Sequence, residues 1–532
     1  MIIHVAPQAK SGCSLLASVI RADTGVCPYA LDALFWGCKS IVFRPQEHCF
    51  QVLRALLLGS KVIAFGLSKH CFQTSGALLS DVNTTAFATR EGGGGMIFVC
   101  ISFGRMTKIM YLCSGKWRTA PAVAKNTKKS NTMPNISERG QLMPESPIRK
   151  LAPLATAAKE RGIHVYHLNI GQPDLPTPQV ALDALKNIDR TVLEYSPSQG
   201  IRSYREKLAQ YYKRFKILVD PDDIIVTCGG SEAVLFAFLS CLNPGDEIII
   251  PEPAYANYIS FAISAGAVIR TISSTIEEGF SLPKVEKFEE LINERTRAIL
   301  ICNPNNPTGY LYTRREMNQI RDLVKKYDLY LFSDEVYREY IYTGSPYISA
   351  CHLEGIEQNV ILIDSVSKRY SECGIRIGAL VTKNEAVKAA VMKLCQARLS
   401  PPLIGQIIAE ASCDAPESYY RDVYDEYVER RKCLIDGLNR IPGVYSPIPM
   451  GAFYTVAKLP VDDSEKFCRW CLEEFSYEGQ TIMMAPAAGF YTTPGAGINQ
   501  VRIAYVLKKE DLEHALVVLR KALEAYPGRV ED

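Results

Sequence analysis

One lysine stands between a serine and an arginine at a spacing that could hold a phosphorylated cofactor. Lys368 lies three residues after Ser365 and eight before Arg376. A lysine amine forms a covalent link to a carbonyl group only when it can lose its proton, and a hydroxyl and a guanidinium nearby suit a phosphate. These three residues therefore predict a site for pyridoxal phosphate.

The residues before this lysine predict where it lies in the fold. Residues 359–364 form an apolar run that is typical of a buried strand, and Lys368 falls just beyond its carboxyl end. Most lysines are solvated surface charges. In open α/β sheets, however, ligands bind beyond the carboxyl ends of strands, which favours a site here.

Four further predicted strands end in residues that could complete such a site. Amides at a helix start can bind a phosphate, a ring can stack on a flat heterocycle, and a buried carboxylate needs a cationic partner such as a protonated pyridine nitrogen. Each feature alone is equally well explained as a turn or as core packing. The predicted strand 223–228 leads to the glycine turn Gly229–Glu232 with a helix over 233–242, and the strand 247–250 leads to Tyr255. The strand 297–302 leads to Asn306, and the strand 328–334 leads to Asp334 with Tyr337.

Composition is that of an ordinary globular protein with an unusual first quarter. The 532 residues are 47% hydrophobic and 22% charged, enough for two or three domains. Residues 1–132 carry 15 Lys and Arg against 5 Asp and Glu, so they hold +10 while the remainder holds −7. Seven of the 17 cysteines also lie there, and none shows disulfide spacing, as expected of reduced thiols in the cytoplasm. We interpret the single CxxC, Cys468 to Cys471, as structural and expect no metal site.

Residues 1–132 show no sustained helical or strand period and contain four consecutive glycines from Gly92. Three interpretations stay open: a poorly ordered extension or targeting arm, a small nucleic-acid-binding module, or an upstream extension that is not part of the native protein. We expect no membrane span, because Arg54 and Lys61 interrupt the best apolar window, and no secretory signal at the start. From Met133 onwards, apolar strands alternate with amphipathic helices, which predicts an α/β fold with a mainly parallel sheet.

From about Met133 to Pro527 the sequence resembles the class I/II aminotransferases of pyridoxal-phosphate fold type I, and among them the bacterial aspartate aminotransferase-like enzymes. The motifs that carry the resemblance are Asn169-Ile-Gly-Gln-Pro-Asp174, Tyr195-Ser-Pro-Ser-Gln-Gly200, Asn306-Pro-Thr-Gly309, Asp334-Glu-Val-Tyr337, Ser365-Val-Ser-Lys368, Gly374-Ile-Arg376-Ile-Gly378 and Arg502-Ile-Ala-Tyr505.

The resemblance implies two domains and a homodimer. It implies a large cofactor-binding domain with a seven-stranded sheet over residues 179–415, and a smaller α+β domain built from residues 133–178, which include an N-terminal arm, and residues 416–532. In such dimers the tyrosine that matches Tyr195 reaches the cofactor phosphate of the neighbouring subunit.

The resemblance also implies a role for each site residue. Lys368 would hold the cofactor and move the substrate proton, Asp334 would keep the pyridine nitrogen protonated, and Arg502 would bind the substrate α-carboxylate as a fork. The further cofactor residues are Gly230, Ser231, Glu232, Tyr255, Asn306, Tyr337, Ser365, Arg376 and Tyr195. Gly171, Asn306 and Arg502 are the predicted substrate-binding residues, and Lys368, Asp334 and Tyr337 the catalytic ones.

The resemblance predicts amino transfer by a ping-pong mechanism, with aspartate as donor and 2-oxoglutarate as acceptor. Two departures leave aromatic, methionine and broad neutral donors open: Ser231 stands where one bacterial aspartate subgroup has lysine, and Tyr255 replaces the common tryptophan. A lyase on the same scaffold is a second alternative. A transcriptional regulator is a third, suggested by the basic residues 1–132, but no helix-turn-helix pattern supports nucleic-acid binding there.

Overall fold

The computed structural model describes residues 134–344 and 346–531, together with four strands before them. The chain divides into two units, Met1–Pro134 and Asn135–Asp532, which are described separately. In the first unit the strands β1 (Thr85–Glu91), β2 (Met96–Phe103), β3 (Met106–Cys113) and β4 (Lys116–Thr119) form an antiparallel sheet in that order. The sequence did not predict this sheet. Our other expectations for residues 1–132 lie outside the described residues.

The second unit contains the predicted seven-stranded sheet. Its strand order is β6-β12-β11-β10-β9-β7-β8, and only β12 is antiparallel to its neighbours. All five strands predicted before the site residues are present, with bounds shifted by one or two residues. The strands are β6 (Ile224–Thr227), β7 (Glu247–Glu252), β8 (Val268–Ser273), β9 (Thr296–Cys302), β10 (Tyr330–Asp334), β11 (Val360–Ser365) and β12 (Gly378–Val381).

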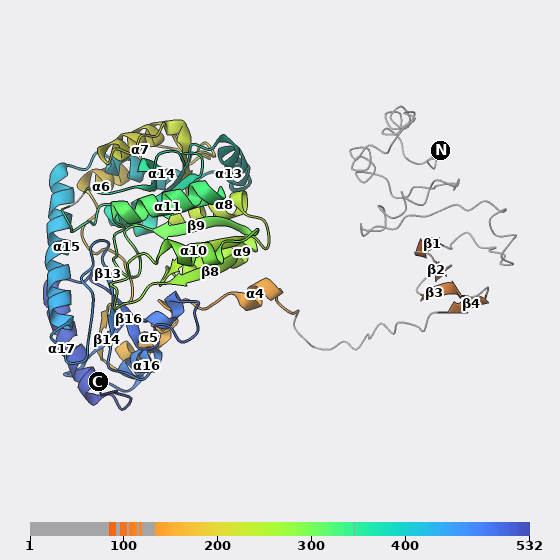
Figure 1. The fold of residues 1–532 in the computed structure, drawn as a ribbon. Coiled ribbons are helices and arrows are strands. Elements are labelled where there is room, and N and C mark those ends of the chain that lie inside the picture. The colour runs from red at the N-terminus through yellow and green to blue at the C-terminus, as the bar shows by residue number, and fades with distance from the viewer. Residues whose placement is uncertain are drawn as a thin grey trace. The chain divides into compact units, whose positions relative to one another are not determined.

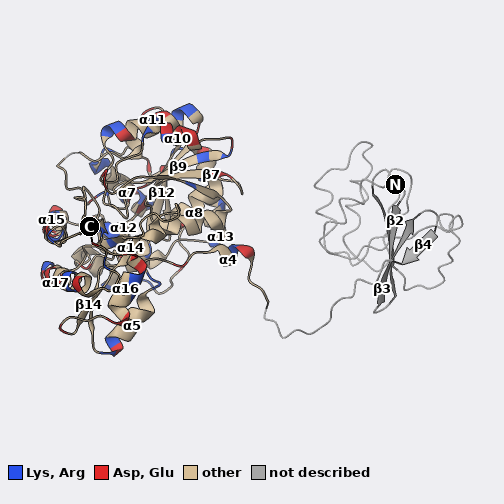
Figure 2. Ribbon diagram, turned by 60° about the horizontal axis from the view of Figure 1, so that its bottom comes forward, with Lys and Arg blue, Asp and Glu red and all other residues tan. Residues whose placement is uncertain are grey.

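Helices cover both faces of this sheet (Figure 1). Alternate residues of β9 explain why: Ala298 and Leu300 pack with α8 (Gly230–Cys241), α9 (Asn257–Ala265) and α13 (Glu385–Arg398), whereas Ile299 and Ile301 pack with α10 (Val285–Leu291) and α11 (Arg314–Tyr327). Helices α7 (Arg202–Arg214) and α14 (Leu403–Ser412) pack near β6 and β12. Charged residues of both signs are frequent on α10 and α11 (Figure 2).

The rest of the second unit is built from the first and the last segments of that unit. Strand β5 (His164–His167) pairs in parallel with β14 (Gln480–Met483), and β13 (Tyr454–Lys458), β16 (Gln500–Ala504) and β15 (Ala485–Pro486) form an antiparallel sheet in that order. Around them pack α5 (Ala152–Glu160), α15 (Glu417–Leu438), α16 (Ser464–Glu473) and α17 (Lys509–Ala525), with α15 beside α17. Cys468 and Cys471 are free and fully buried in α16, which agrees with a structural role.

Short elements complete the unit: α4 (Glu138–Leu142), α6 (Gln179–Lys186), α12 (Val366–Arg369) and the 3-10 helices η2 (Pro221–Asp223), η3 (Ala350–His352), η4 (Cys373–Ile375) and η5 (Ala487–Phe490). No helix among the described residues is long and apolar enough to cross a membrane.

Candidate active site

A cavity of about 610 Å³ opens at the carboxyl ends of the sheet strands. Most of the residues that the sequence predicted for the site line this one cavity, although they come from segments more than 300 residues apart. They are Gly171, Gly230, Ser231, Tyr255, Asn306, Asp334, Tyr337, Ser365, Lys368, Arg376 and Arg502. Glu232 and Tyr195 do not line it.

Lys368 lies in the four-residue helix α12 directly after β11. Ser365 is the N-cap of this helix, and its Oγ accepts a hydrogen bond from Ser367 N at 3.1 Å. The Lys368 Nζ donates to the carbonyl oxygen of Gly171 at 2.8 Å and lies 3.9 Å from Cys373 Sγ. The amine therefore points across the cavity towards the segment that carries Gly171, where a substrate could displace it.

Asp334 ends β10 with its carboxyl group buried. Tyr258 OH donates to Asp334 Oδ2 at 2.6 Å, and Val336 N lies 3.4 Å from Oδ1. Burial raises the pKa of Asp334 to about 6, although the hydrogen bond from Tyr258 opposes this effect. Because no ion pair reaches Asp334 from the described residues, a protonated ring nitrogen would satisfy a carboxylate that otherwise lacks a cation.

A chain of polar contacts connects Arg502 to the cavity tyrosines. Arg502 Nη1 donates to Asn306 Oδ1 at 3.2 Å, and Asn306 Nδ2 donates to Tyr337 OH at 3.3 Å. The hydroxyls of Tyr337 and Tyr454 lie 3.1 Å apart. The contacts fix the positions of the amide and of both rings, so that the Tyr337 hydroxyl and the Asn306 amide can meet one ligand atom.

Arg502 is a buried cation without a carboxylate partner among the described residues. Its guanidinium is centred 4.6 Å from the ring of Tyr454 and 5.1 Å from that of Phe490, and it donates to the carbonyl of Asn169. Its Nε has no hydrogen-bond partner, and burial lowers the pKa of this guanidinium below its usual value. An arginine held in this way is well suited to bind a carboxylate through hydrogen bonds from two of its nitrogens.

The start of α8 and Arg376 form a corner suited to a phosphate. Gly229 occupies the N-cap position of α8 with a φ of 80°, and a Cβ on it would lie 2.4 Å from Arg376 Nη2. The glycine therefore lets the guanidinium approach the free amides of the helix start. We had expected this helix to begin at residue 233; because Gly229 takes the cap position, it begins at Gly230 and Ser231 lies in its first turn.

The two predicted residues outside the cavity lie elsewhere for identifiable reasons. Glu232 forms an ion pair with Arg398 and accepts a hydrogen bond from Cys228 N at 2.8 Å, so its side chain closes the turn before α8. Tyr195 is 77% exposed. A tyrosine that is exposed to this extent is available to a second chain.

Several cavity residues were not predicted from the sequence. Tyr258 holds Asp334, and Tyr454 contacts both Tyr337 and Arg502. The remaining ones include Ser146, Ile148, Arg149 and Cys373. Cys373 lies between two of the quoted motifs, whereas Ser146, Ile148 and Arg149 lie far from all of them. The unpredicted lining residues inside the motifs include Ile170, Gln172, Ser367 and Gly374.

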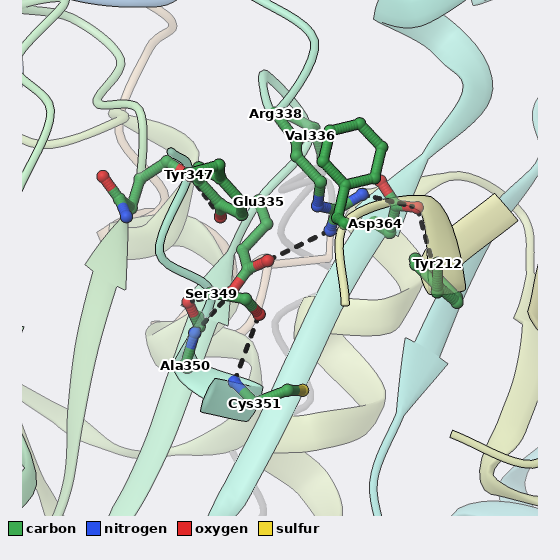
Figure 3. Close-up of polar contacts among 12 residues, drawn as sticks. Tyr212, Glu335, Val336, Arg338, Tyr347, Ser349, Ala350, Cys351 and Asp364 are labelled. Carbon is green, nitrogen blue, oxygen red and sulfur yellow. Dashed lines mark hydrogen bonds and ion pairs between the residues drawn. The ribbon is translucent and has the colours of Figure 1, made fainter. Parts of the chain in front are cut away.

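A buried ionic network involves Glu335 and Arg369, the chain neighbours of the cavity residues Asp334 and Lys368. Figure 3 shows its contacts at Glu335, Arg338 and Asp364. Arg338 binds Glu335 at 3.1 Å and Asp364 at 3.5 Å, and Arg369 binds Asp364 at 2.7 Å. Tyr212 OH donates to Asp364 Oδ2 at 2.8 Å. Burial alone would raise the pKa of Asp364, but Arg369 and Arg338 outweigh it and hold that pKa below its usual range. The network ties the end of β10 to the end of β11.

The fold and the cavity together define a class of protein. A mainly parallel seven-stranded sheet, a lysine beyond one strand end, an acid at the next and a phosphate corner at a third are the features of a pyridoxal-phosphate protein of fold type I. The residues fit this cofactor: among the described residues Asp334 has no cationic partner, Arg376 lies close to the start of α8, and Lys368 lines the same cavity.

The comparisons with known proteins agree. The family model described as aminotransferase class I and II matches residues 163–519, and the chain therefore belongs to this family. An aspartate aminotransferase of Pyrococcus horikoshii is 33% identical over 401 residues, which are 73% of this chain and 97% of that protein. An aromatic-amino-acid aminotransferase 2 of Thermococcus litoralis is 30% identical over 397 residues, 73% of this chain and 98% of that protein.

A solved structure of aspartate aminotransferase from Thermus thermophilus with maleate is similar as well. It is 28% identical, covers 73% of this chain and 100% of its own, and superposes with a TM-score of 0.67. The predicted enzyme class and fold are thus confirmed.

Proposed function

We propose that this aminotransferase uses pyridoxal phosphate to transfer the amino group of L-aspartate to 2-oxoglutarate by a ping-pong mechanism. The observation that carries the proposal is the single cavity lined by Lys368, Asp334 and Arg502, of which Arg502 has no carboxylate partner among the described residues. The aspartate aminotransferases among its relatives support the substrate pair.

The residues of the cavity have separate tasks. Arg502 binds the substrate α-carboxylate and, with Gly171, orients the Cα–H bond towards Lys368. Lys368 Nζ then takes the proton from Cα as general base. Asp334 would pair with the ring nitrogen of the cofactor, and Tyr337 and Asn306 would donate to its ring oxygen. When bound, pyridoxal phosphate supplies a ring that accepts the electron pair left on Cα.

The phosphate corner keeps the cofactor attached while Lys368 is free. Arg376, Ser365 and the first amides of α8 at Gly230 and Ser231 would hold the phosphate, and Tyr255 would stack on the ring. Burial raises the pKa of Tyr255 to about 12, so it stays neutral at working pH. Residues 179–415 are proposed as the cofactor-binding domain and residues 133–178 with 416–532 as the domain that closes over substrate; the pairing of β5 with β14 supports this division.

The test is an absorbance spectrum of the purified, cofactor-loaded protein before and after single amino acids, without an acceptor. Loss of the visible band with aspartate, and its recovery with 2-oxoglutarate, would establish the donor and the acceptor together. Lys368→Ala should abolish the band that depends on the covalent link and all turnover, whereas the exposed Lys393→Ala should change neither. A band that ignores every amino acid would contradict the proposal.

An aromatic donor is the second candidate. The cavity includes the rings of Tyr255, Phe261 and Tyr454, and the Thermococcus litoralis relative is named for aromatic amino acids. The same titration separates the candidates, because bleaching by phenylalanine or tyrosine at lower concentrations than aspartate would favour the aromatic activity. Steady product formation without any 2-oxo acid would indicate a lyase instead.

We further propose a homodimer with shared active sites. Tyr195 and its neighbours Val192 and Leu193 are exposed apolar or aromatic side chains on one segment, and such a patch is typical of an interface. Mixing two inactive variants tests this proposal. If Tyr195 of one chain completes the site of the other, refolding Tyr195→Ala together with Lys368→Ala restores activity, because one site in each hybrid has both native residues. No gain over the separate variants would contradict shared sites.

A further inference from the structure

The cavity is more positive than its two assigned anions require. Arg376 faces the phosphate corner and Arg502 is suited to the α-carboxylate, yet a third guanidinium, Arg149, also lines the cavity. Among the described residues that line the cavity, Asp334 is the only acidic side chain, and it is assigned to the ring nitrogen. A third guanidinium beyond those assigned to the phosphate and the α-carboxylate could bind a further negative group of a ligand.

Arg149 lies on a segment that the fold holds firmly. Asn169 Nδ2 donates to the carbonyl of Ile148 at 2.7 Å, and Lys150 forms an ion pair with Glu465 at 2.6 Å. Pro147 packs closely against Gly489 of η5. The residues on both sides of Arg149 are thus fixed, so the position of its Cα relative to the cavity is set by the scaffold.

The guanidinium of Arg149 itself has no hydrogen bond or ion pair with any residue in the described part of the chain. Its charge nevertheless acts on the cavity, because it opposes the burial that raises the pKa of Tyr255. Since Arg149 is exposed, it stays hydrated when the cavity holds no substrate, and it needs no internal partner.

Asn169 connects this segment to the α-carboxylate site. Its side chain binds Ile148, while its own carbonyl accepts a hydrogen bond from Arg502. One residue therefore sets the relative positions of the segment that carries Arg149 and of the guanidinium of Arg502. A substrate with two carboxylates could engage both arginines at once, whereas a neutral amino acid could engage only Arg502.

We propose that Arg149 determines donor specificity by binding the side-chain carboxylate of a dicarboxylic substrate. This rests on the proposed function. Arg149 supplies the cation that Ser231 does not provide. The side-chain carboxylate of the substrate would then be bound from the segment before α5, not from the start of α8. Because Arg149 is exposed, salt screens its contribution to substrate binding more than it screens the contribution of the buried Arg502.

The experiment compares Arg149→Gln and Arg149→Lys with the native enzyme. Arg139→Gln is the matched control, because Arg139 is an exposed arginine of the same N-terminal segment that does not line the cavity. In Arg149→Gln the ratio of kcat/KM for aspartate to kcat/KM for alanine should fall roughly 10- to 100-fold, as for loss of a charge-assisted hydrogen bond. In Arg149→Lys this ratio should lie between the values for the native enzyme and for Arg149→Gln, since lysine keeps the charge but cannot bind a carboxylate through two nitrogens.

A binding measurement makes the test independent of turnover. Maleate has two carboxylates and no amino group, so calorimetric titration of the cofactor-loaded enzyme reports recognition alone. Affinity for maleate should fall by the same factor in Arg149→Gln, with less effect on propionate and none in Arg139→Gln. Equal losses for maleate and propionate, an unchanged maleate affinity, or no maleate binding by the native enzyme would each overturn the assignment.

The two proposals can fail separately. If no amino acid bleaches the native enzyme but maleate binding still depends on Arg149, the function fails and the dicarboxylate site stands. If aspartate is a good donor and its ratio to alanine is the same in Arg149→Gln, the function stands and the assignment of Arg149 is wrong.

Discussion

Replacement of Glu372 by glutamine should stabilise the protein in alkaline solution and destabilise it in acid. Glu372 follows Lys368 by four residues and is 2% exposed. Ser412 Oγ donates to its Oε1, while its Oε2 has no partner in the described part of the chain. Burial raises the pKa of Glu372 from 4.5 to about 8, although Ser412 and Arg369 act in the opposite direction.

The sign of the effect follows from the direction of this pKa. Below pH 4.5 the carboxyl group is protonated in both states and costs nothing. Between pH 4.5 and about 8 the unfolded chain releases the proton and the folded protein keeps it, so stability is lost as pH rises through this window. At about 1.4 kcal/mol for each pKa unit, the total loss is roughly 5 kcal/mol.

Glutamine has the same shape but does not titrate. Its amide nitrogen would lack an acceptor, at a cost of about 1 to 3 kcal/mol. Glu372→Gln should therefore be less stable than the native protein by roughly 1 to 2 kcal/mol at pH 5 and more stable by about 2 to 3 kcal/mol at pH 8.5.

Urea unfolding followed by circular dichroism at pH 5, 6, 7, 8 and 9 measures this crossover. Glu410→Gln is the control, because Glu410 lies on the same helix as Ser412, is only half-buried and accepts a hydrogen bond from Ser203 at 3.1 Å. Midpoints of the native protein and of Glu372→Gln that change in parallel with pH would refute the reasoning.

Three other perturbations follow from the site. Cofactor affinity should fall as pH drops below about 6, because burial raises the pKa of Asp334 to about 6 and its protonation removes the partner of the ring nitrogen. Absorbance titration with pyridoxal phosphate from pH 5 to 8 measures this affinity. Asp334→Asn should show weak, pH-independent binding. Arg338→Ala should lower the free energy of unfolding by roughly 3 to 5 kcal/mol, because it leaves two buried carboxylates without this partner; an unchanged urea midpoint would contradict it. Gly171→Ala should raise the KM for the amino acid roughly tenfold or more, since its Cβ would lie 1.7 Å from Tyr454 Oη, whereas the control Gly374→Ala meets nothing within 4 Å; equal KM values would refute the steric argument.

The sequence predicted the parts of the site that depend on strand ends. Apolar runs set the strands, and a parallel sheet brings their carboxyl ends to one edge, so Asp334 and Lys368 could be placed together from their positions alone. Tyr258 and Tyr454 could not be found in this way. They come from a helix and from a separate sheet, and a buried tyrosine in either place is ordinary core packing until the fold brings it against Asp334 or Gly171.

Specificity was harder to predict than chemistry for the same reason. The resemblance places the expected cation at position 231, and because Ser231 carries no charge, the sequence leaves the donor open. Arg149 lies outside every motif, and its relation to Arg502 depends on Asn169, which joins two segments through one side chain and one carbonyl. Contacts of that kind are set by tertiary packing and leave no period or spacing in the sequence.

The buried ionic network changes how a loss of activity should be interpreted. At the end of β10 and in α12, neighbouring residues belong to different surroundings: Asp334 and Lys368 line the cavity, while Glu335 and Arg369 belong to the ionic network. Removing either kind of residue would abolish turnover, but for different reasons. A cavity residue has water or ligand on one side, so its loss leaves the unfolding midpoint nearly intact. Loss of Arg369 removes one buried partner of Asp364 and allows both strand ends to shift. This change lowers the unfolding midpoint and displaces Lys368.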